Sequence, residues 1–365
     1  SYSVTGVQTC ALPISRSART AAWKRNGGEG MKACVAGMGA IGGMIGFGLA
    51  KSGWEVTGLA RGTVLKALRA AGLRYTEAPA EDKAAPEPET AWIRAVDPSD
   101  GVDALGVQDL VVVAVKAPSL GSILPNLSPL IGPRTIVLPA INGVPWWFFH
   151  GLGGGLEGNV LSSVDPDGKF LKAVPPEAIL GCVVHCGAFC PEPGLVRALP
   201  RKRLIIGEPG GGEGGRVSVL AAHLREAGFD VVESGRIQRD IWYKLWGNMT
   251  MNPISALTGA TMDRILDDPL LAEFCRAIME EARQVGARIG CPISQSVEER
   301  FAITRGLGAF KTSMLQDVEA RKAVELDALL AAPVEIGALA GVPTPNMEIL
   351  LGMARLHART LGLYP

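Results

Sequence analysis

The pattern of hydrophobic and polar positions changes once along the chain, near residue 234. From Met31 to about Gly207, short apolar runs alternate with helical or looped segments, as in a doubly wound sheet. From about Ser234 onwards, apolar residues recur with helical spacing. The sequence therefore predicts an α/β fold in which a sheet domain spans residues 31–234 and an all-helical domain spans residues 235–365, with a cleft between them.

The individual elements follow from the same pattern. No apolar run is long enough to span a bilayer. Runs rich in Val, Ile and Leu predict strands at residues 32–36, 54–59, 110–115, 135–140, 179–185 and 203–206. Helical periods lie at residues 239–252, 269–289, 294–305, parts of 313–342, and 347–361.

Residues 1–30 differ from the rest of the chain because they show no sustained helical or strand period. The apolar run at residues 11–14 is too short and poorly flanked for a secretory signal. The Gly-Gly-Glu-Gly stretch before Met31 would be encoded by purine-rich codons that resemble a bacterial ribosome-binding site. Our hypothesis is that translation naturally starts at Met31 and that the preceding residues are upstream or adapter-derived sequence. The alternative is a disordered extension.

A glycine motif joins the first predicted strand to the first helix, and a second strand follows. In this context Gly-x-Gly-x-x-Gly is the fingerprint of a dinucleotide-binding Rossmann-type unit. Its first glycine permits a tight turn, the second lets the backbone approach a pyrophosphate, and the third allows close packing of helix on strand, while the helix N-terminus favours the anion. The predicted cofactor-binding segment comprises Gly37, Met38, Gly39, Ala40, Ile41 and Gly42.

The end of the second strand indicates which dinucleotide binds. NAD-preferring proteins place a carboxylate there to accept from the ribose 2′-hydroxyl, but this strand ends in Gly58-Leu-Ala-Arg61-Gly62. The guanidinium of Arg61 cannot accept a hydrogen bond, whereas its planar fork suits a 2′-phosphate. NADP(H) is therefore favoured over NAD(H), and the alternative is that Arg61 is an ordinary surface residue.

Charge and cysteine content narrow the choice of partners. The 36 basic and 36 acidic residues balance, which gives no electrostatic case for nucleic acid or an anionic membrane. The cysteines follow no disulfide framework, as expected of a cytoplasmic protein. Cys182, Cys186 and Cys190 recur every fourth residue around His185, but the segment resembles a buried strand and no second cluster completes a tetrahedral site. We predict no metal.

Three polar residues form a row in an otherwise apolar segment. Lys244, Asn248 and Asn252 are spaced i, i+4, i+8, which sets an ammonium and two amides on one face of a helix. Because an unpaired lysine among apolar neighbours is costly, the row suggests a site that holds and protonates a small polar substrate. The alternative is a surface polar stripe that ends where Pro253 interrupts the helix.

Two strand ends of the sheet domain carry polar side chains towards the expected cleft. Ligands bind at the carboxyl ends of strands in such sheets. Lys116 follows one strand and could meet cofactor hydroxyls or phosphate, and Asn142 follows the next and could meet the nicotinamide or the substrate. The alternative for Asn142-Gly143 is a simple turn.

The segment from Lys311 to Glu325 offers two further candidates. Ser313 and Gln316 fit a capping box, but a helix N-terminus with a free hydroxyl is also a natural carboxylate site. Glu325 is expected within the following helix, where it could face the site or pair with Arg321 one turn earlier.

Together these motifs resemble those of the ketopantoate reductase (2-dehydropantoate 2-reductase) family over essentially residues 31–361. The resemblance implies a dinucleotide-binding domain joined to a helical domain like that of 6-phosphogluconate dehydrogenase. It implies NADPH-dependent reduction of a 2-oxo acid to a 2-hydroxy acid, with 2-dehydropantoate, a precursor in pantothenate biosynthesis, as the expected substrate. It assigns Lys244 as general acid, Asn248, Asn252 and Ser313 as substrate ligands, Glu325 as an active-site hydrogen-bonding partner, and Arg61, Lys116 and Asn142 to the cofactor side.

Departures from the family pattern leave the substrate open. Asn142-Gly143 continues into the apolar run 144–150, where simpler members have a shorter polar connection, and a further asparagine of some members falls here at Thr261 or Met262. If Trp146 and Trp147 reshape the pocket, a bulkier or more apolar 2-oxo acid should compete with 2-dehydropantoate. The alternatives are a paralogous reductase of another 2-oxo acid or an imine, and a non-catalytic NADPH-binding sensor, against which a retained proton donor argues. The sequence leaves open whether the second domain forms a homodimer.

Overall fold

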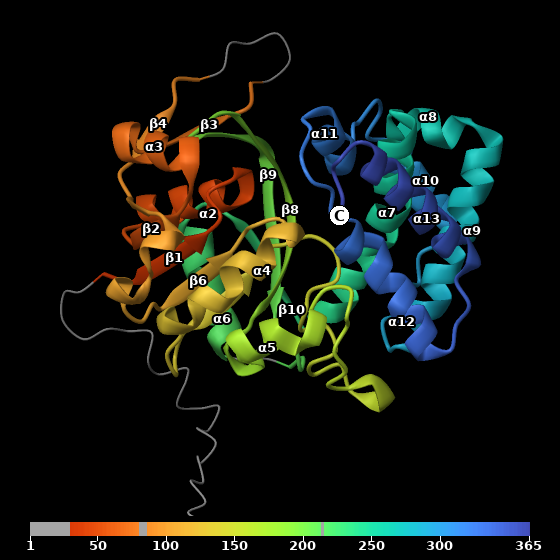
Figure 1. Cartoon of the computed structure of the whole chain (residues 1–365), viewed down its shortest axis with the longest axis horizontal. Coiled ribbons are helices and arrows are strands. Elements are labelled where there is room, and N and C mark those ends of the chain that lie inside the picture. Colours follow the sequence, from red (N-terminus) through yellow and green to blue (C-terminus); the bar gives the residue numbers. More distant parts are fainter. Residues whose placement is uncertain (1–29, 80–85, 213–214) are drawn as a thin grey trace, which may run out of the picture.

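The chain forms two domains that lie side by side (Figure 1). The computed structural model describes residues 30–79, 86–212 and 215–365, so the hypothesis for residues 1–30 concerns a stretch that lies almost wholly outside the described residues. The sheet domain extends to Ser234, and the helical domain begins with the helix that starts at Ile237.

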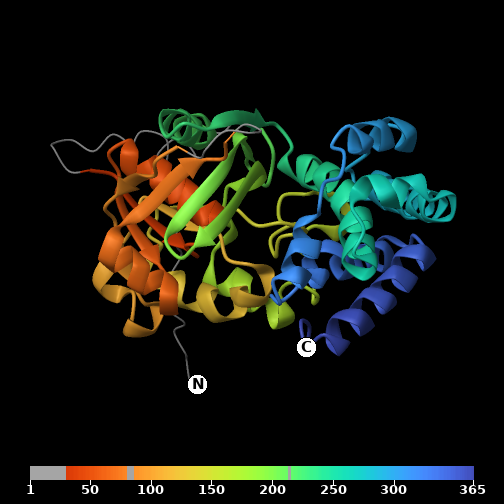
Figure 2. The ribbon, with the colours of Figure 1, turned by 90° about the horizontal axis from the view of Figure 1, so that it is seen from above.

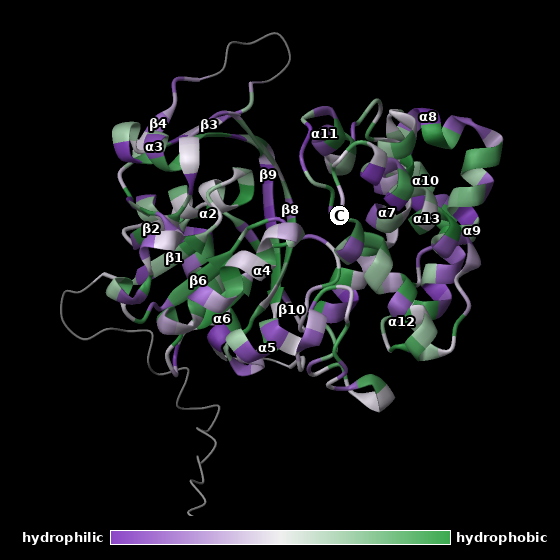
Figure 3. Cartoon of the chain, in the orientation of Figure 1, coloured by the Kyte–Doolittle hydropathy of each residue, from purple (hydrophilic) through white to green (hydrophobic). Residues whose placement is uncertain are grey.

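The first sheet is parallel and has the strand order β5-β2-β1-β6-β7. Every residue of β6 and β7 is buried, because parallel sheets are covered on both faces, and β6 carries even hydrophobic colouring in Figure 3. Ala36 pairs with Leu59 on one side and with Val113 on the other, so these three strands end at one edge. The strands are β1 (Lys32–Ala36), β2 (Glu55–Leu59), β5 (Arg94–Val96), β6 (Leu110–Val113) and β7 (Ile136–Pro139).

The prediction that residues 179–185 and 203–206 continue this sheet is wrong. Both belong to a second sheet, in which β8 pairs antiparallel with β9 and the remaining order is β10-β9-β3-β4. Figure 2 shows this hairpin, in yellow-green, lying over the first sheet. The sequence pattern revealed only one buried end of each strand, because the far end of β8 and the middle of β9 are exposed. The strands are β3 (Leu73–Glu77), β4 (Glu89–Ala91), β8 (Gly181–Glu192), β9 (Leu195–Gly207) and β10 (Asp230–Ser234).

Helix α2 (Ala40–Lys51) packs against strands of both sheets. Its glycines make this close approach feasible, since a Cβ at Gly43 would lie 2.6 Å from the Val196 side chain. The pairing of Ile179 with Val137 of β7 marks the point where the chain leaves the first sheet for the second. The other helices of this domain are α3 (Gly62–Ala71), α4 (Leu120–Ile123), α5 (Lys169–Ala173) and α6 (Gly215–Glu226).

The helical domain is built around α7 (Ile237–Thr258), which continues six residues beyond the predicted end at Asn252. Pro253 does not end the helix, because residues 253–256 are buried and their packing offsets the missing backbone bond. The short helix α8 was not predicted. The elements that follow are α8 (Met262–Asp267), α9 (Pro269–Arg288), α10 (Val297–Arg305), α11 (Ser313–Glu319), a π-helical turn (Asp327–Ala331), α12 (Ala332–Ala340) and α13 (Pro345–Thr360).

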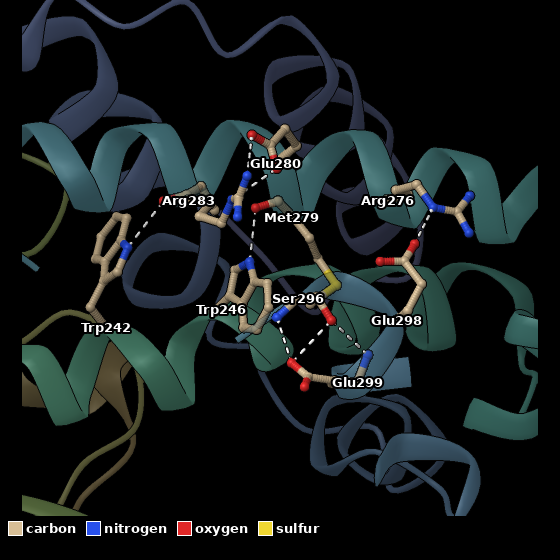
Figure 4. Close-up of polar contacts among 10 residues, drawn as sticks. Trp242, Trp246, Arg276, Met279, Glu280, Arg283, Ser296, Glu298 and Glu299 are labelled. Carbon is tan, nitrogen blue, oxygen red and sulfur yellow. Dashed lines mark hydrogen bonds and ion pairs between the residues drawn. The ribbon is translucent and has the colours of Figure 1, made fainter. Parts of the chain in front are cut away.

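Two indole groups fix the rotation of α7 about its axis. The Nε1 atoms of Trp242 and Trp246 donate to the carbonyls of Ala282 and Met279 on α9, at 3.1 and 2.8 Å (Figure 4). These tryptophans flank the helix face opposite Lys244, so their attachment to α9 turns the polar row towards the sheet domain.

The two domains share one hydrophobic core. The segment after β7 contributes Trp146, Trp147 and two phenylalanines to a buried cluster that also contains Trp242 and Trp246 of α7. The carboxylate of Glu335 on α12 adds a polar tie, because it accepts hydrogen bonds from the backbone N–H and hydroxyl groups of Ser162 and Ser163. In the described part of the chain, no helix has the length and apolar character needed to cross a bilayer.

Candidate active site

Lys244 bridges the two domains at the centre of the predicted site. Its ammonium donates to Oδ1 of Asn142 and to the carbonyl oxygen of Val184, both at 2.6 Å. Burial lowers its pKa to about 8, against the opposite effects of Cys182, Cys186 and Glu325. An ammonium has three N–H donors, so these two acceptors leave one N–H for a ligand. A lysine that titrates near neutral pH is suited to proton transfer.

Asn142 and Gly143 do not form only a simple turn, because the backbone here also contacts the helical domain. Gly143 has φ of +83°, and a Cβ there would lie 2.5 Å from the carbonyl oxygen of Ala328 in the π-helical turn. The following N–H, that of Val144, donates to this same oxygen at 2.8 Å. The end of β7 therefore contacts the helical domain through its backbone, and this contact places Asn142 beside Lys244.

Glu325 binds the backbone that follows the end of β6. Its Oε1 accepts from the backbone N–H of Ala117 at 3.0 Å, just after β6. Burial raises the pKa of the carboxyl, while the Ala117 N–H and the charge of Lys116 act in the opposite direction. The alternative pairing with Arg321 is wrong, because Glu325 precedes the helical turn and the structure places no ion pair between these two described residues.

Lys116 makes an ion pair with Asp317 of α11, across the domain boundary. The family resemblance assigns Lys116 to the cofactor side, and no sequence pattern indicates Asp317 as its partner. Since the side chain of Lys116 remains 43% exposed, its ammonium stays accessible at the edge where the strands end.

Asn252 and Ser313 meet on the helical side of the site. Asn252 is buried, and its Nδ2 lies 3.5 Å from the hydroxyl oxygen of Ser313, at the long limit for a hydrogen bond. The predicted capping box at Ser313 is wrong by one residue, since the cap is Thr312, whose hydroxyl accepts from the backbone N–H of Leu315. The hydroxyl of Ser313 is therefore not used as a cap.

A small cavity lies against this constellation. Its volume is about 20 Å³, and its polar lining includes Asn142, Lys244 and Asn248. Asn252, Ser313 and Glu325 do not line it. The structure thus brings seven predicted site residues to the domain boundary, Lys116 included, but only three of them border this cavity.

The glycine loop has the geometry that a dinucleotide requires. Gly37 has φ of +101°, and a Cβ at Gly42 would lie 1.9 Å from the Gly37 carbonyl oxygen, so both positions need glycine. A Cβ at Gly39 would have no atom within 4 Å, which leaves open space before the N-terminus of α2 for an anionic group. The Met38 side chain is buried against Gly58, so only its backbone is available to a ligand.

Arg61 lies at the end of β2 as predicted. It is exposed and immediately precedes α3. Its guanidinium is therefore accessible at the edge where β1 and the glycine loop end, and the structure is compatible with its predicted role on a 2′-phosphate.

The cysteine repeat around His185 lies along strand β8. Within the ranges that the structure describes, no group of three or more His, Cys, Asp or Glu side chains could hold a metal ion. Burial, together with Lys244 and Arg300, lowers the pKa of His185 to about 4. Cys182 lines the small cavity instead, and burial raises the pKa of its thiol to about 12.

This combination of a glycine loop at a parallel sheet edge and a lysine supplied by a helical domain defines a dinucleotide-dependent oxidoreductase. Residues 33–147 match the family model for ketopantoate reductase PanE/ApbA, and residues 236–358 match the model for its C-terminal domain. The chain belongs to the ketopantoate reductase family, whose members are NADP-dependent oxidoreductases.

Individual relatives agree with this placement. A 2-dehydropantoate 2-reductase of Mesorhizobium japonicum is 40% identical over 92% of this chain and 100% of its own length. A crystal structure of a Ralstonia solanacearum MolK2 protein assigned as a ketopantoate reductase is 53% identical, with a TM-score of 0.85 over 92% of this chain and 99% of that chain. A D-mandelate dehydrogenase structure shares the fold at 23% identity, with a TM-score of 0.77 over 91% of this chain and 100% of its own.

Proposed function

We propose that this chain catalyses the NADPH-dependent reduction of 2-dehydropantoate to pantoate, a step of pantothenate biosynthesis. The observation that carries the proposal is Lys244, an ammonium with a pKa lowered to about 8 that is held by Asn142 and Val184 at the domain boundary. A binding protein has no need for such a group, whereas a ketone reductase requires a proton donor at this point.

The residues of the sheet domain would hold the cofactor. The glycine loop of residues 37–42 would receive the pyrophosphate, Arg61 the 2′-phosphate, and Lys116 cofactor hydroxyls or phosphate. When bound, NADPH supplies the hydride. Arg61 lies at the strand end where NAD-preferring proteins carry a carboxylate, which supports the preference for NADP(H).

The helical domain would orient the ketone and supply its proton. Negative charge develops on the ketone oxygen as the hydride arrives, and the free N–H of Lys244 would stabilise this charge and then supply the proton. Asn248, Asn252 and Ser313 would orient the substrate on one side of Lys244. Glu325 keeps negative charge near the ammonium while its hydrogen bond to Ala117 fixes the end of β6.

The proposal is tested with a panel of 2-oxo acids and imines, whose reduction is followed by the loss of NADPH absorbance. We expect 2-dehydropantoate to give the highest kcat/KM and NADPH to be preferred over NADH. A clear preference for another acceptor would favour the paralogous reductase. NADPH binding without turnover of any acceptor would favour the sensor.

The proposal extends to location, boundaries and assembly. We place the enzyme in the cytoplasm, supported by the free thiols of the described cysteines, and we keep residue 234 as the domain boundary. A homodimer is supported by Ile349, Met353 and Leu356, which are exposed with helical spacing on α13. A Staphylococcus aureus ketopantoate reductase of the same fold is dimeric. Light scattering of the protein and of its Met353→Glu variant tests this assembly, since a homodimer through α13 should dissociate in the variant.

A further inference from the structure

The short segment that follows α13, residues 361–365, packs against the stretch of chain that carries Glu325. Its end, marked C in Figure 1, lies at the boundary between the two domains. Glu325 itself belongs to an irregular stretch, residues 322–325, between α11 and the π-helical turn. Because irregular backbone has no regular ladder of hydrogen bonds, the position of the Glu325 carboxylate depends on contacts with other parts of the chain.

Two contacts tie the segment to this irregular stretch. The carbonyl oxygen of Leu363 accepts from the backbone N–H of Val324 at 3.1 Å, one residue before Glu325. The hydroxyl of Tyr364 donates to Oδ1 of Asp327, two residues after Glu325. Glu325 is therefore held on both sides by the same short segment.

The segment is fixed in turn on the end of α13. The backbone N–H groups of Gly362 and Leu363 donate to the carbonyls of Arg359 and Ala358 at 2.9 and 2.8 Å, which is the pattern of a Schellman motif. The Leu363 side chain is buried, and the guanidinium carbon of Arg359 lies 5.4 Å from the centre of the Tyr364 ring. The ring is thus held in place, and its hydroxyl is directed at one acceptor.

The contact with Asp327 reaches the ends of two strands. Asp327 begins the π-helical turn, and the carbonyl of the next residue, Ala328, accepts from the Val144 N–H after β7 at 2.8 Å. Glu325, two residues before Asp327, accepts from the Ala117 N–H after β6 at 3.0 Å. Displacement of this turn would therefore move the Glu325 carboxylate and loosen its contacts with both strand ends.

We propose that Tyr364 is a positioning residue for ketone reduction, because its hydroxyl, through Asp327, holds the carboxylate of Glu325 in place beside Lys244. The proposal rests on the proposed reductase function. Tyr364 does not line the cavity beside Lys244, so it acts through the residues that it holds and not through contact with the reacting atoms.

The charge of Glu325 gives its position a measurable signature. It opposes the lowering of the Lys244 pKa by burial, as do the thiols of Cys182 and Cys186 on β8. Burial raises the pKa of both thiols to about 12, so they remain neutral where Lys244 titrates. A displaced Glu325 should therefore lower the pKa of Lys244 further. The charged groups that face Glu325 stay in place in the variants below: Lys116, Asp317 and Lys244.

The experiment compares variants that each lose a single hydroxyl. Tyr364→Phe keeps the ring and removes the bond to Asp327, whose Oδ1 still has Arg355 at 3.6 Å. Burial, together with the bond to Asp327, raises the pKa of Tyr364, so in the parent chain the hydroxyl remains a donor where Lys244 titrates. Thr360→Ala is the matched control at the same end of α13, because the Thr360 hydroxyl donates to the carbonyl three residues earlier.

The measurement is kcat/KM for 2-dehydropantoate as a function of pH. We expect Tyr364→Phe to lower kcat/KM by about fivefold or more, within the roughly 10²-fold that a displacement of about 1 Å can cost. The alkaline limb of its profile should also move to lower pH, because the charge of Glu325 no longer acts as strongly on Lys244. Asp327→Ala removes the same bond from the other partner and should change both quantities in the same direction. Thr360→Ala should stay within about twofold of the parent.

A double variant tests whether the tyrosine acts through the carboxylate. In a Glu325→Gln background, Tyr364→Phe should move the alkaline limb no further, because the charge is already absent. A second shift in that background, an unmoved limb in Tyr364→Phe alone, or an equal loss in Thr360→Ala would overturn the inference while leaving the reductase function intact. Absence of turnover by the parent chain would overturn the proposed function and this inference with it.

Discussion

The ammonium of Lys244 titrates close to neutral pH, so ketone reduction should slow as the solution becomes alkaline. The pKa of this group is lowered to about 8 by burial, and the reaction needs its protonated form. The protonated fraction is about one half at the pKa and falls roughly tenfold for each further pH unit. The rate should therefore be close to its maximum below about pH 7 and should have lost about tenfold near pH 9.

The assay is the pH dependence of kcat/KM for 2-dehydropantoate, followed by NADPH absorbance. A deuterated cofactor shows whether hydride transfer limits the rate at each pH. Lys244→Ala should lower turnover by about 10²–10⁴-fold and remove the alkaline decline, while NADPH affinity stays near normal because the sheet domain sets it.

Stability provides the control for this experiment. The folded-state pKa of Lys244 is below the ordinary lysine value of 10.5, so between the two values the unfolded chain binds more protons than the folded chain. The contribution of Lys244 to stability should thus increase as pH rises through about 8, in the range where activity falls. A profile of kcat/KM that stays flat to about pH 10 with hydride transfer limiting would refute the role of Lys244 as proton donor.

Four further outcomes test other parts of the molecule. Arg61→Ala should weaken NADPH binding by about 1–3 kcal/mol and leave NADH binding nearly unchanged, and equal losses in calorimetry would contradict the 2′-phosphate assignment. Glu325→Gln removes a negative charge near Lys244 but keeps an acceptor for Ala117, so the alkaline limb should move to lower pH, whereas an unmoved limb would show that the charge has no such effect. Glu335→Ala should lower the free energy of unfolding by about 1–3 kcal/mol in urea titrations, and no change would mean that its tie to the sheet domain is not stabilising. Deletion of residues 1–30 should leave both melting temperature and turnover nearly unchanged, and a large loss would show that the segment belongs to the fold.

The parts of the fold that sequence could predict are those with a local cause. The glycine loop is readable because each glycine answers a steric demand within a few residues, as the 1.9 Å approach at Gly42 shows. The row of Lys244, Asn248 and Asn252 is readable because helical spacing alone sets it on one face. The family and the α/β fold that these motifs predict are confirmed by the comparisons with known proteins.

The errors have a different origin, because they depend on partners distant in sequence. The β8–β9 hairpin was hidden since only part of each strand is buried, and α7 passes Pro253 because tertiary packing outweighs one missing backbone bond. The choice of Thr312 over Ser313 as helix cap is a shift of one residue, within the usual uncertainty of helix ends.

The contacts around the predicted proton donor could not be predicted from the sequence either. Asp317 and Ala117 were missed because their partners come from the other domain. No pattern in the sequence marks a backbone carbonyl such as that of Val184 as an acceptor, since every residue carries one.

The use of the Val184 carbonyl has an evolutionary consequence. One acceptor of Lys244 belongs to the side chain of Asn142, which a single codon change can delete, but the other is part of the main chain and persists whatever amino acid occupies position 184. Side-chain variation on this stretch of β8 can therefore remodel the surroundings of the ammonium without releasing it. Descendants of this gene can change the ketone that they reduce while the main-chain carbonyl of residue 184 still accepts a hydrogen bond from Lys244.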